Sequence, residues 1–379
     1  MTFLDAVPGF TCGTHRVFVW DRGHNTMLGE LTPLLAVRWN RIRDDISHAE
    51  IVVATHECCE LLGDLETVFM EIEITRLDVP VWNGVITRLE YEYSDVRLFA
   101  EDILWVAKRR VLEVGYNNSW PNIQQVLDMM HILLAQQCYG AWGDLWNMLG
   151  NLHPIRNPAG FPEPRTTRVV NKFQVTIWED FDKYAEDMGA DYTVIGRDIF
   201  YWDNHLAWAV LPELDENHIS QFPRIVEYGN SFATRAFVTN GRGWAGHAGN
   251  PDLTWADYGG GPVDFLITNA EEGEDANDPP TPEELESWQE SAVHAIAASA
   301  PPPVSVVIPA NTTLMPGAPW NVVDLIPGAW FPITVNRLCR TVSEWQRLNE
   351  VLVTESAPNG ETVQFSAISA PKTRIDPVA

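Results

Sequence analysis

The densest group of metal-binding residue types lies at His56-Glu57-Cys58-Cys59-Glu60. Adjacent cysteines do not face one tetrahedral ion as a Cys-x-x-Cys pair does, and no second ligand pair follows at a recognisable spacing. The ten histidines form no His-Glu-x-x-His and no His-x-His pattern. We therefore expect a short helix that buries one thiol as a small apolar group, and we predict neither a metal nor another cofactor.

Two further motifs invite a chemical interpretation. Gly241 to Gly246 matches the G-x-G-x-x-G loop that binds a pyrophosphate, but the motif needs a helix directly afterwards and His247 to Asp252 is a poor helix start. Gly229 to Ala233 resembles a nucleophile elbow around Ser231, yet the residues that follow look extended where an elbow needs a helix. We expect a glycine-rich loop at the first motif and a strand serine at the second.

Acid–base catalysis needs two carboxylates at a defined separation, as in glycosidases. The neighbouring acids that could form such a pair are Asp44 with Asp45, and Glu179 with Asp180 and Asp182. Because the chain has 52 acids, the sequence nominates no pair, and we assign no catalytic residue. The 16 tryptophans could be sugar platforms, but they are spread from Trp20 to Trp345, which favours cores and subunit interfaces.

The charge balance argues against nucleic-acid binding. The 379 residues include 25 Lys plus Arg against 52 Asp plus Glu, a formal net charge of −27. Binding by counterion release needs clustered cations, which this chain can hardly supply. With 45% hydrophobic residues, the chain is too apolar to be disordered.

The N-terminus has no basic region followed by a continuous apolar stretch, so we expect no export signal. No apolar run approaches the ~20 residues that cross a bilayer. The five cysteines are odd in number and scattered, which is typical of reduced thiols in a cytoplasm. We expect the chain to fold inside a cell.

Alternating apolar and polar residues predict strands from Thr14 to Val111. Met70 to Ile74 and Glu90 to Tyr93 alternate most clearly, as in a sheet with one face on a core. Six strands at this spacing indicate a barrel or a sandwich. The expected strands are His15 to Trp20, Leu34 to Arg41, Ala49 to Ala54, Val68 to Arg76, Val81 to Tyr93 and Val96 to Ala100.

After Gly115 the period changes to that of helices. Ile123 to Leu134 form one apolar stripe with Ser119 as the expected N-cap, and a second short stripe runs from Trp142 to Leu149. Asn151 to Arg165, with four prolines, is expected to be a connector. Thr176 and Glu179 have the spacing of a capping box, which predicts a helix that ends before Gly189. A hairpin is expected from Asp191 to Trp202.

Strands return from Pro223 to Asn240, followed by a Gly- and Asp-rich stretch and then by Glu271 to Glu286, which carries eight acids and no base. Such a stretch repels itself and indicates a surface loop. A helix is predicted from Thr281 to Ile296. The remaining strands are Val304 to Ile308, Ala329 to Arg337, and a terminal hairpin of Leu348 to Glu355 with Thr362 to Ile368.

These patterns predict an α+β, mainly β protein with two antiparallel β-barrel domains and smaller mixed domains. The first barrel is expected at 1–115 and a mixed helical and β domain at 116–220. The second, discontinuous barrel would comprise 221–245 and 304–379, and 246–303 would be an inserted acidic loop and helix.

Short motifs along almost the whole chain resemble, in their residues and their order, the minor tail proteins of long-tailed actinobacteriophages. The motifs are Cys12-Gly13-Thr14-His15-Arg16, Gly29-Glu30-Leu31-Thr32-Pro33-Leu34, Arg43-Asp44-Asp45-Ile46-Ser47, Cys58-Cys59-Glu60-Leu61-Leu62, Trp82-Asn83-Gly84-Val85-Ile86-Thr87-Arg88, Ala100-Glu101-Asp102, Tyr116-Asn117-Asn118-Ser119, Asp191-Tyr192-Thr193-Val194-Ile195-Gly196-Arg197, Glu227-Tyr228-Gly229, Thr239-Asn240-Gly241, Val306-Val307-Ile308-Pro309-Ala310-Asn311 and Leu325-Ile326-Pro327-Gly328.

The resemblance implies a tail hub related to the baseplate hubs of contractile phages. Such a hub is a homotrimer in the virion tail tip, in which two tail-tube-like barrels per subunit close a ring beneath the tail tube. Its expected neighbours are a tail-tube or distal tail protein, the tape measure protein and other minor tail proteins, and DNA passes through its lumen without specific binding. The alternative is a tail-tip glycoside or peptidoglycan hydrolase, or a carbohydrate-binding protein, which release of sugars or peptides from host cell wall would reveal.

Overall fold

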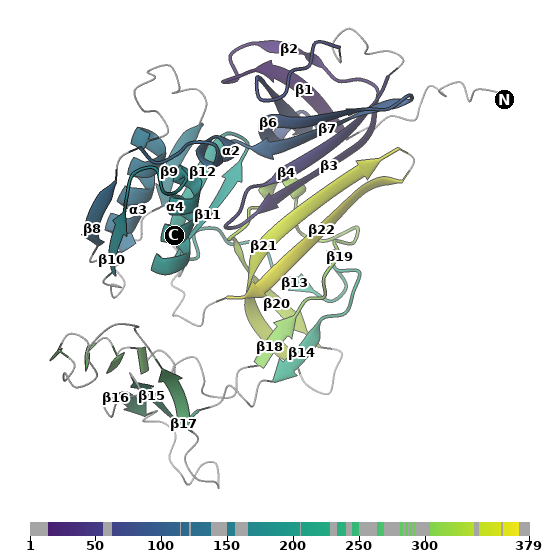
Figure 1. Ribbon diagram of the computed structural model, residues 1–379. Coiled ribbons are helices and arrows are strands. Elements are labelled where there is room, and N and C mark those ends of the chain that lie inside the picture. Colours follow the sequence, from purple (N-terminus) through teal and green to yellow (C-terminus); the bar gives the residue numbers. More distant parts are fainter. Residues whose placement is uncertain are drawn as a thin grey trace. The chain divides into compact units, whose positions relative to one another are not determined.

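Twelve hydrogen-bonded strands form one large sheet in the computed structural model (Figure 1). The structure describes residues 14–55, 63–113, 115–120, 123–137, 150–155, 166–204, 206–227, 233–239, 245–249, 264–268, parts of 281–292, 304–336, 341–357 and 359–370. The strands of the large sheet are β1 (His15–Asp21), β2 (Met27–Glu30), β3 (Leu34–Ile42), β4 (His48–Ala54), β5 (Met70–Arg76), β6 (Val79–Tyr91), β7 (Asp95–Asp102), β13 (Leu214–Asp215), β19 (Thr312–Thr313), β20 (Trp330–Val335), β21 (Val342–Ser356) and β22 (Gly360–Ser369).

The large sheet joins the two ends of the chain. Its order is β13-β20-β21-β3-β4-β7-β6-β5-β1-β2, with β22 beside β21 and β19 beside β22, and only the β13–β20 pairing is parallel. The long hairpin of β21 and β22 lies directly beside β3, as Figure 1 shows. Strands expected in two separate barrels therefore share one sheet, and no barrel closes within the described part of the chain.

The expected strands of the N-terminal half and the terminal hairpin are confirmed, with shifts of one or two residues at most ends, but β21 begins at Val342 instead of the expected Leu348. The sequence missed β2, a strand of only four residues at one end of the sheet. Along β1 the inward side chains Val17 and Val19 are fully buried, whereas Arg16 on the opposite face is exposed. Period-two burial of this kind gives the sheet one apolar face.

A smaller layer of helices and strands carries a second core. Its elements are α2 (Trp105–Lys108), β8 (Tyr116–Trp120), α3 (Ile123–Ile132), the π-helix η1 (Leu133–Gln137), β9 (Asn151–Ile155), β10 (Thr166–Val170), α4 (Ile177–Met188), β11 (Ala190–Ile195) and β12 (Asp198–Asp203). Strands β11, β12 and β9 form one small sheet, and β8 pairs with β10. Phe181 packs edge-on against Tyr192, with ring centroids 4.9 Å apart, and both rings are fully buried. We call α3, η1, α4, β9, β11 and β12 the helical layer.

Two predictions for the helical layer are confirmed. In α4 the Thr176 hydroxyl accepts from the Glu179 N–H while the Glu179 carboxylate accepts from the Thr176 N–H, and Gly189 ends the helix at φ 68°. The hairpin predicted at Asp191 to Trp202 is formed by β11 and β12.

Two other predictions were wrong. Ser119 is not an N-cap, because it lies in β8 opposite Thr167. The proline-rich connector begins with a strand, β9, whose pairing with β12 the local composition did not reveal. The stripe from Trp142 to Leu149 lies outside the described residues.

Contacts divide the chain into two compact units, residues 1–222 with 308–379, and 223–307. In the second unit β14 (Arg224–Glu227) pairs with β18 (Val304–Val307), and β15 (Arg235–Thr239) lies between β16 (Ala245–Gly249) and β17 (Asp264–Thr268). The stretch expected to be a glycine-rich loop and an acidic insertion thus contains two strands. The helix predicted from Thr281 to Ile296 is described only in part.

Among the described residues, no helix is long and apolar enough to cross a membrane.

Candidate functional site

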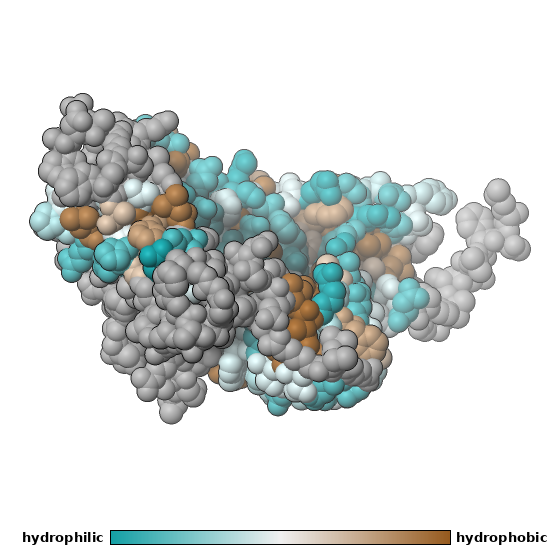
Figure 2. All heavy atoms as spheres, turned by 90° about the horizontal axis from the view of Figure 1, so that it is seen from below, coloured by the Kyte–Doolittle hydropathy of each residue, from teal (hydrophilic) through white to brown (hydrophobic). Residues whose placement is uncertain are grey.

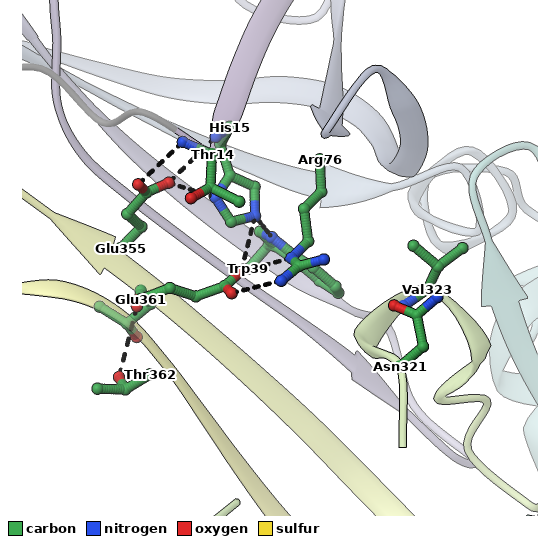
Figure 3. A network of polar contacts seen from close by, with 10 residues as sticks. Thr14, His15, Trp39, Arg76, Asn321, Val323, Glu355, Glu361 and Thr362 are labelled. Carbon is green, nitrogen blue, oxygen red and sulfur yellow. Dashed lines mark hydrogen bonds and ion pairs between the residues drawn. The ribbon is translucent and has the colours of Figure 1, made fainter. Parts of the chain in front are cut away.

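A buried polar network joins the first strand of the large sheet to its last hairpin (Figure 3). The Nδ1 atom of His15 in β1 lies 2.6 Å from Oε2 of Glu355 in β21. The backbone N–H groups of Thr14 and His15 donate to the same carboxylate, each at 3.1 Å. His15 and Glu355 are 2% and 4% exposed. Charge-assisted bonds in a site this dry are stronger than surface ion pairs.

The contacts of its two ring nitrogens indicate the tautomer of neutral His15. The indole N–H of Trp39 in β3 lies 3.1 Å from Nε2 of His15. Indole can only donate, so Nε2 accepts and the ring proton of neutral His15 resides on Nδ1. That proton points at Glu355, which makes His15 a bridge between β3 and β21.

Acids and bases next to His15 complete this network, which we call the His15 latch: His15, Trp39, Arg76, Glu355 and Glu361. Arg76 in β5 donates through Nε and Nη2 to both carboxylate oxygens of Glu361 in β22, each at 2.6 Å. Burial pushes the pKa of Glu355 upward, but the bonds from His15 and Thr14 hold that pKa below its usual value. The latch thus ties β1 and β5 to the β21–β22 hairpin without any backbone pairing between them.

The acids singled out in the sequence have structural roles where they are described. Glu179 closes the capping box of α4, and Asp180 beside it is fully buried. The Asp45 carboxylate accepts from the N–H of Ile46 at 2.7 Å. Asp44 and Asp182 line one cavity of about 350 Å³ together with Arg43, Ala185, Glu186, Ala190, Asp191, Asn204 and Arg347.

The motifs considered for metal, cofactor or nucleophile chemistry are mostly undescribed. His56 to Glu60, Ser231 and Gly241 to Trp244 lie outside the described residues, and the glycine motif runs into strand β16 instead of the helix that a pyrophosphate loop requires. Within the described residues no group of three or more His, Cys, Asp or Glu side chains is arranged to hold a metal ion.

Among the described residues, strand β2 is an edge strand of the large sheet and lies beside a groove of mixed polar and apolar lining. Met27 and Leu28 in this edge strand are 54% and 43% exposed. A groove of about 340 Å³ adjoins it, which we call the β2 groove, lined by Arg16, Phe18, Trp20, Met27, Glu73, Thr75, Asp78 and Pro80. Arg16 is held between Glu30 and Asp78 at 2.9 and 3.0 Å. Natural proteins usually protect sheet edges, so an edge with exposed apolar side chains indicates a contact surface.

Exposed apolar side chains also mark both ends of β5. Val68, a β-branched residue, has φ 73°, and Phe69 beside it is 66% exposed. At the other end Leu77 has φ 48° in the turn to β6 and is also 66% exposed. Left-handed backbone is unfavourable for such residues and gathers at functional sites. Brown hydrophobic patches interrupt the teal hydrophilic surface on the face drawn in Figure 2 as well.

Sequence reasoning did not single out the latch. His15 alternates with Val17 and Val19 on the inward face of a predicted strand, which is a signal for a core histidine. Its partner Glu355 lies 340 positions away, and no local pattern links the two. The left-handed backbone at Leu77, in the turn between β5 and β6, was not predicted from the sequence either.

No family model matches the sequence, and no curated protein shows significant similarity to it. Solved structures do match over nearly the whole chain. The 43 kDa tail protein of prophage MuSo2 from Shewanella oneidensis superposes with a TM-score of 0.55 at 11% identity, covering 94% of this chain and 97% of that one.

Two further tail proteins match equally well. The tail protein from Neisseria meningitidis MC58 gives a TM-score of 0.54 at 11% identity, with 93% of this chain and 96% of that one covered. Prophage tail protein gp18 from Listeria monocytogenes EGD-e gives 0.53 at 10% identity, with 93% and 94% covered. At these identities the match speaks for the fold alone, and the fold of this chain resembles that of these tail proteins.

Proposed function

We propose that this protein is the tail-tip hub of a long-tailed phage, in which three copies form a ring that links the tail tube to the distal tip. The observation that carries the proposal is the match to three tail proteins, two of them from prophages, over 93–94% of this chain and 94–97% of theirs. The motifs shared with minor tail proteins of actinobacteriophages favour that group of phages. The protein would be a structural part of the virion tail tip, made in the host cytoplasm.

The free edge of the large sheet supports assembly into a ring. Within the described part of the chain β2 pairs with β1 alone, so its outer edge is available to a strand of another copy. The expected domains, 1–115 and 221–245 with 304–379, would each supply one half of the continuous sheet, and edge pairing between copies would complete one barrel-like wall from each half. With two such walls per copy, a trimer offers six similar faces to a sixfold tail tube.

Charge supports a channel through which DNA slides. A formal charge of −27 per chain gives the ring a strongly negative field. Carboxylates around a lumen repel the phosphate backbone, so DNA would pass without sticking. The remaining partners of the ring would be the tail-tube or distal tail protein, the tape measure protein and other minor tail proteins.

Labelling of the intact particle tests this proposal. A gold-conjugated antibody against the purified chain should decorate the distal end of the tail in electron micrographs, and the purified protein should have a solution mass of three times the 42.7 kDa chain. Label on the capsid, or absence of the chain from purified virions, would contradict the proposal.

A further inference from the structure

The β2 groove contains a carboxylate that lacks a strong cationic partner. Glu73 of β5 lines the groove, and its side chain is 17% exposed. Among the described residues its ion-pair partner is His24, whose Nε2 lies 3.2 Å from Oε2 of Glu73 but makes no hydrogen bond. Arg16 is not available, because each of its guanidinium nitrogens already donates to Glu30 or Asp78. Since buried charges are normally paired, the groove favours the binding of a further cation.

Two polar groups of the same groove also lack hydrogen-bond partners. Thr75 is 5% exposed, and its hydroxyl makes no hydrogen bond in the described part of the chain. The same holds for the buried indole N–H of Trp20. A buried polar group without a partner is unfavourable, so both groups point to a partner that binds in the groove.

The groove is suited to a long basic side chain. The carboxylate of Glu73 and the hydroxyl of Thr75 can both accept hydrogen bonds from a guanidinium or an ammonium group. The apolar walls at Phe18 and Met27 can cover the aliphatic stem of such a side chain. The chemistry of the groove therefore selects Arg or Lys.

Strand β2 can bind the main chain that carries this basic residue. It pairs with β1 from Phe18 opposite Glu30 to Trp20 opposite Met27, and no described strand covers its other edge. A strand that adds to such an edge gains main-chain hydrogen bonds, and a neighbouring pocket selects its side chains. The exposed Met27 and Leu28 favour apolar neighbours on that strand. The expected occupant is an edge strand that combines a basic residue with apolar ones.

A ring of three identical copies needs two different contact surfaces on each copy. Pairing of β2 with β2 would be self-complementary and would give a two-fold dimer. In a threefold ring, β2 of one copy must meet another element of the next copy. This step rests on the proposed function, which makes the occupant a second copy of this chain.

Strand β14 has the residues that β2 and its groove require. It pairs with β18 alone among the described strands, and a two-stranded ribbon is marginally stable by itself. Arg224 at its start is exposed and forms no hydrogen bond or ion pair within the described residues. Ile225 and Val226 follow and are half-buried, and Phe222 just before the strand is 61% exposed. Of the strands that pair on one side only and whose side chains are described, β14 alone carries Lys or Arg.

We propose that β14 of one copy pairs with β2 of the next copy and inserts Arg224 into the β2 groove, where its guanidinium binds Glu73. The Thr75 hydroxyl can accept from the same guanidinium. Each copy offers one β2 and one β14, so three such contacts close a ring. Because each chain has a formal charge of −27, the copies repel one another at long range, and a local pair of opposite charges offsets this repulsion at the contact.

Charge exchange in the full-length protein tests this contact by light scattering. Arg224→Glu changes an exposed residue and should raise the protein concentration at half-assembly of the trimer on the order of tenfold, with an unchanged unfolding midpoint. Glu73→Arg should have the same effect on assembly. The double variant restores opposite charges and should assemble more readily than either single variant. Arg168→Glu, in the edge strand β10, is the matched control and should assemble like wild type.

The outcomes separate this inference from the hub proposal. If Arg224→Glu assembles like wild type, or if Arg168→Glu is impaired to the same extent, β14 is not the strand at β2 and the inference is overturned. The comparison of these two variants stands even if Glu73→Arg does not fold. A wild type that stays monomeric at every concentration also overturns the inference. Gold labelling of the virion decides the hub proposal independently of all three results.

Discussion

The indole N–H of Trp39 points at Nε2 of His15 from 3.1 Å, so the proton of neutral His15 resides on Nδ1, 2.6 Å from the Glu355 carboxylate. Three strands, β1, β3 and β21, are thereby joined through one imidazole ring. The strength of this relationship can be measured, because each partner can be replaced by a residue that lacks the hydrogen bond.

Trp39→Phe should destabilise the protein by about 1–3 kcal/mol beyond the effect of the smaller ring, because it leaves Nε2 of His15 buried without a donor. The measurement is the free energy of unfolding in urea. Trp330→Phe is the matched control, since Trp330 is also fully buried but its indole N–H has no hydrogen-bond partner among the described residues. Equal losses in the two variants would show that the Trp39–His15 bond contributes nothing.

Glu355→Gln should make the free energy of unfolding less dependent on pH in the acidic range. The pKa of Glu355 is lower in the folded protein than its ordinary value of 4.5. The ionised carboxylate therefore stabilises the folded protein at pH values above 4.5. That stabilisation is lost as the pH falls below 4.5 through the lowered pKa. The variant should therefore be less stable than wild type at pH 7, with a gap that narrows at pH 3.5.

Chemical unfolding at the two pH values measures this gap. Glu92→Gln, whose carboxylate is 55% exposed, should stay within about 0.5 kcal/mol of wild type at both. If the difference in stability between wild type and Glu355→Gln is the same at both pH values, the His15 latch does not depend on the charge of Glu355.

Gly328→Ala should destabilise the fold strongly, whereas Gly317→Ala should cost less. Both glycines have left-handed backbone, at φ 90° and 96°. A Cβ at 328 would meet Cζ2 of Trp202 at 2.1 Å, but nothing lies within 4 Å of a Cβ at 317. The difference between the two thermal midpoints isolates the steric clash from backbone strain. Equal midpoints would contradict the close packing of Trp202 on this turn.

Met27→Lys should lower the fraction of trimer without lowering the stability of the folded subunit. The substitution places a charge on the exposed edge strand β2, where another copy would bind. Met315→Lys is the control, as Met315 is 43% exposed and lies away from β2. Light scattering should show a lower trimer fraction for Met27→Lys alone, with unfolding midpoints unchanged for both. Identical trimer fractions would remove β2 from the subunit contact.

The parts of the fold that local chemistry dictates were predictable from the sequence. The capping box at Thr176 and the alternation in the terminal hairpin each depend on residues a few positions apart. Strand β9 was missed because its proline-containing sequence has a low propensity for strands. It is a strand because it pairs with β12, and such tertiary pairing can override local propensity.

The candidate site was not predictable, for a related reason. His15 and Glu355 are ordinary strand residues until the sheet brings them together across 340 positions. The same holds for Asp44 and Asp191, which the sequence treats as two acids among 52. Their roles come from burial and from the arginines beside them, and neither is encoded in local spacing.

Electron cryomicroscopy of the tail tip tests the hub proposal most directly. Averaging without imposed symmetry should reveal three copies of this chain around the tail axis, with the edge of β2 against a neighbouring copy and carboxylates facing an open channel. A single copy off the axis, or a channel wall lined by basic side chains, would contradict the account.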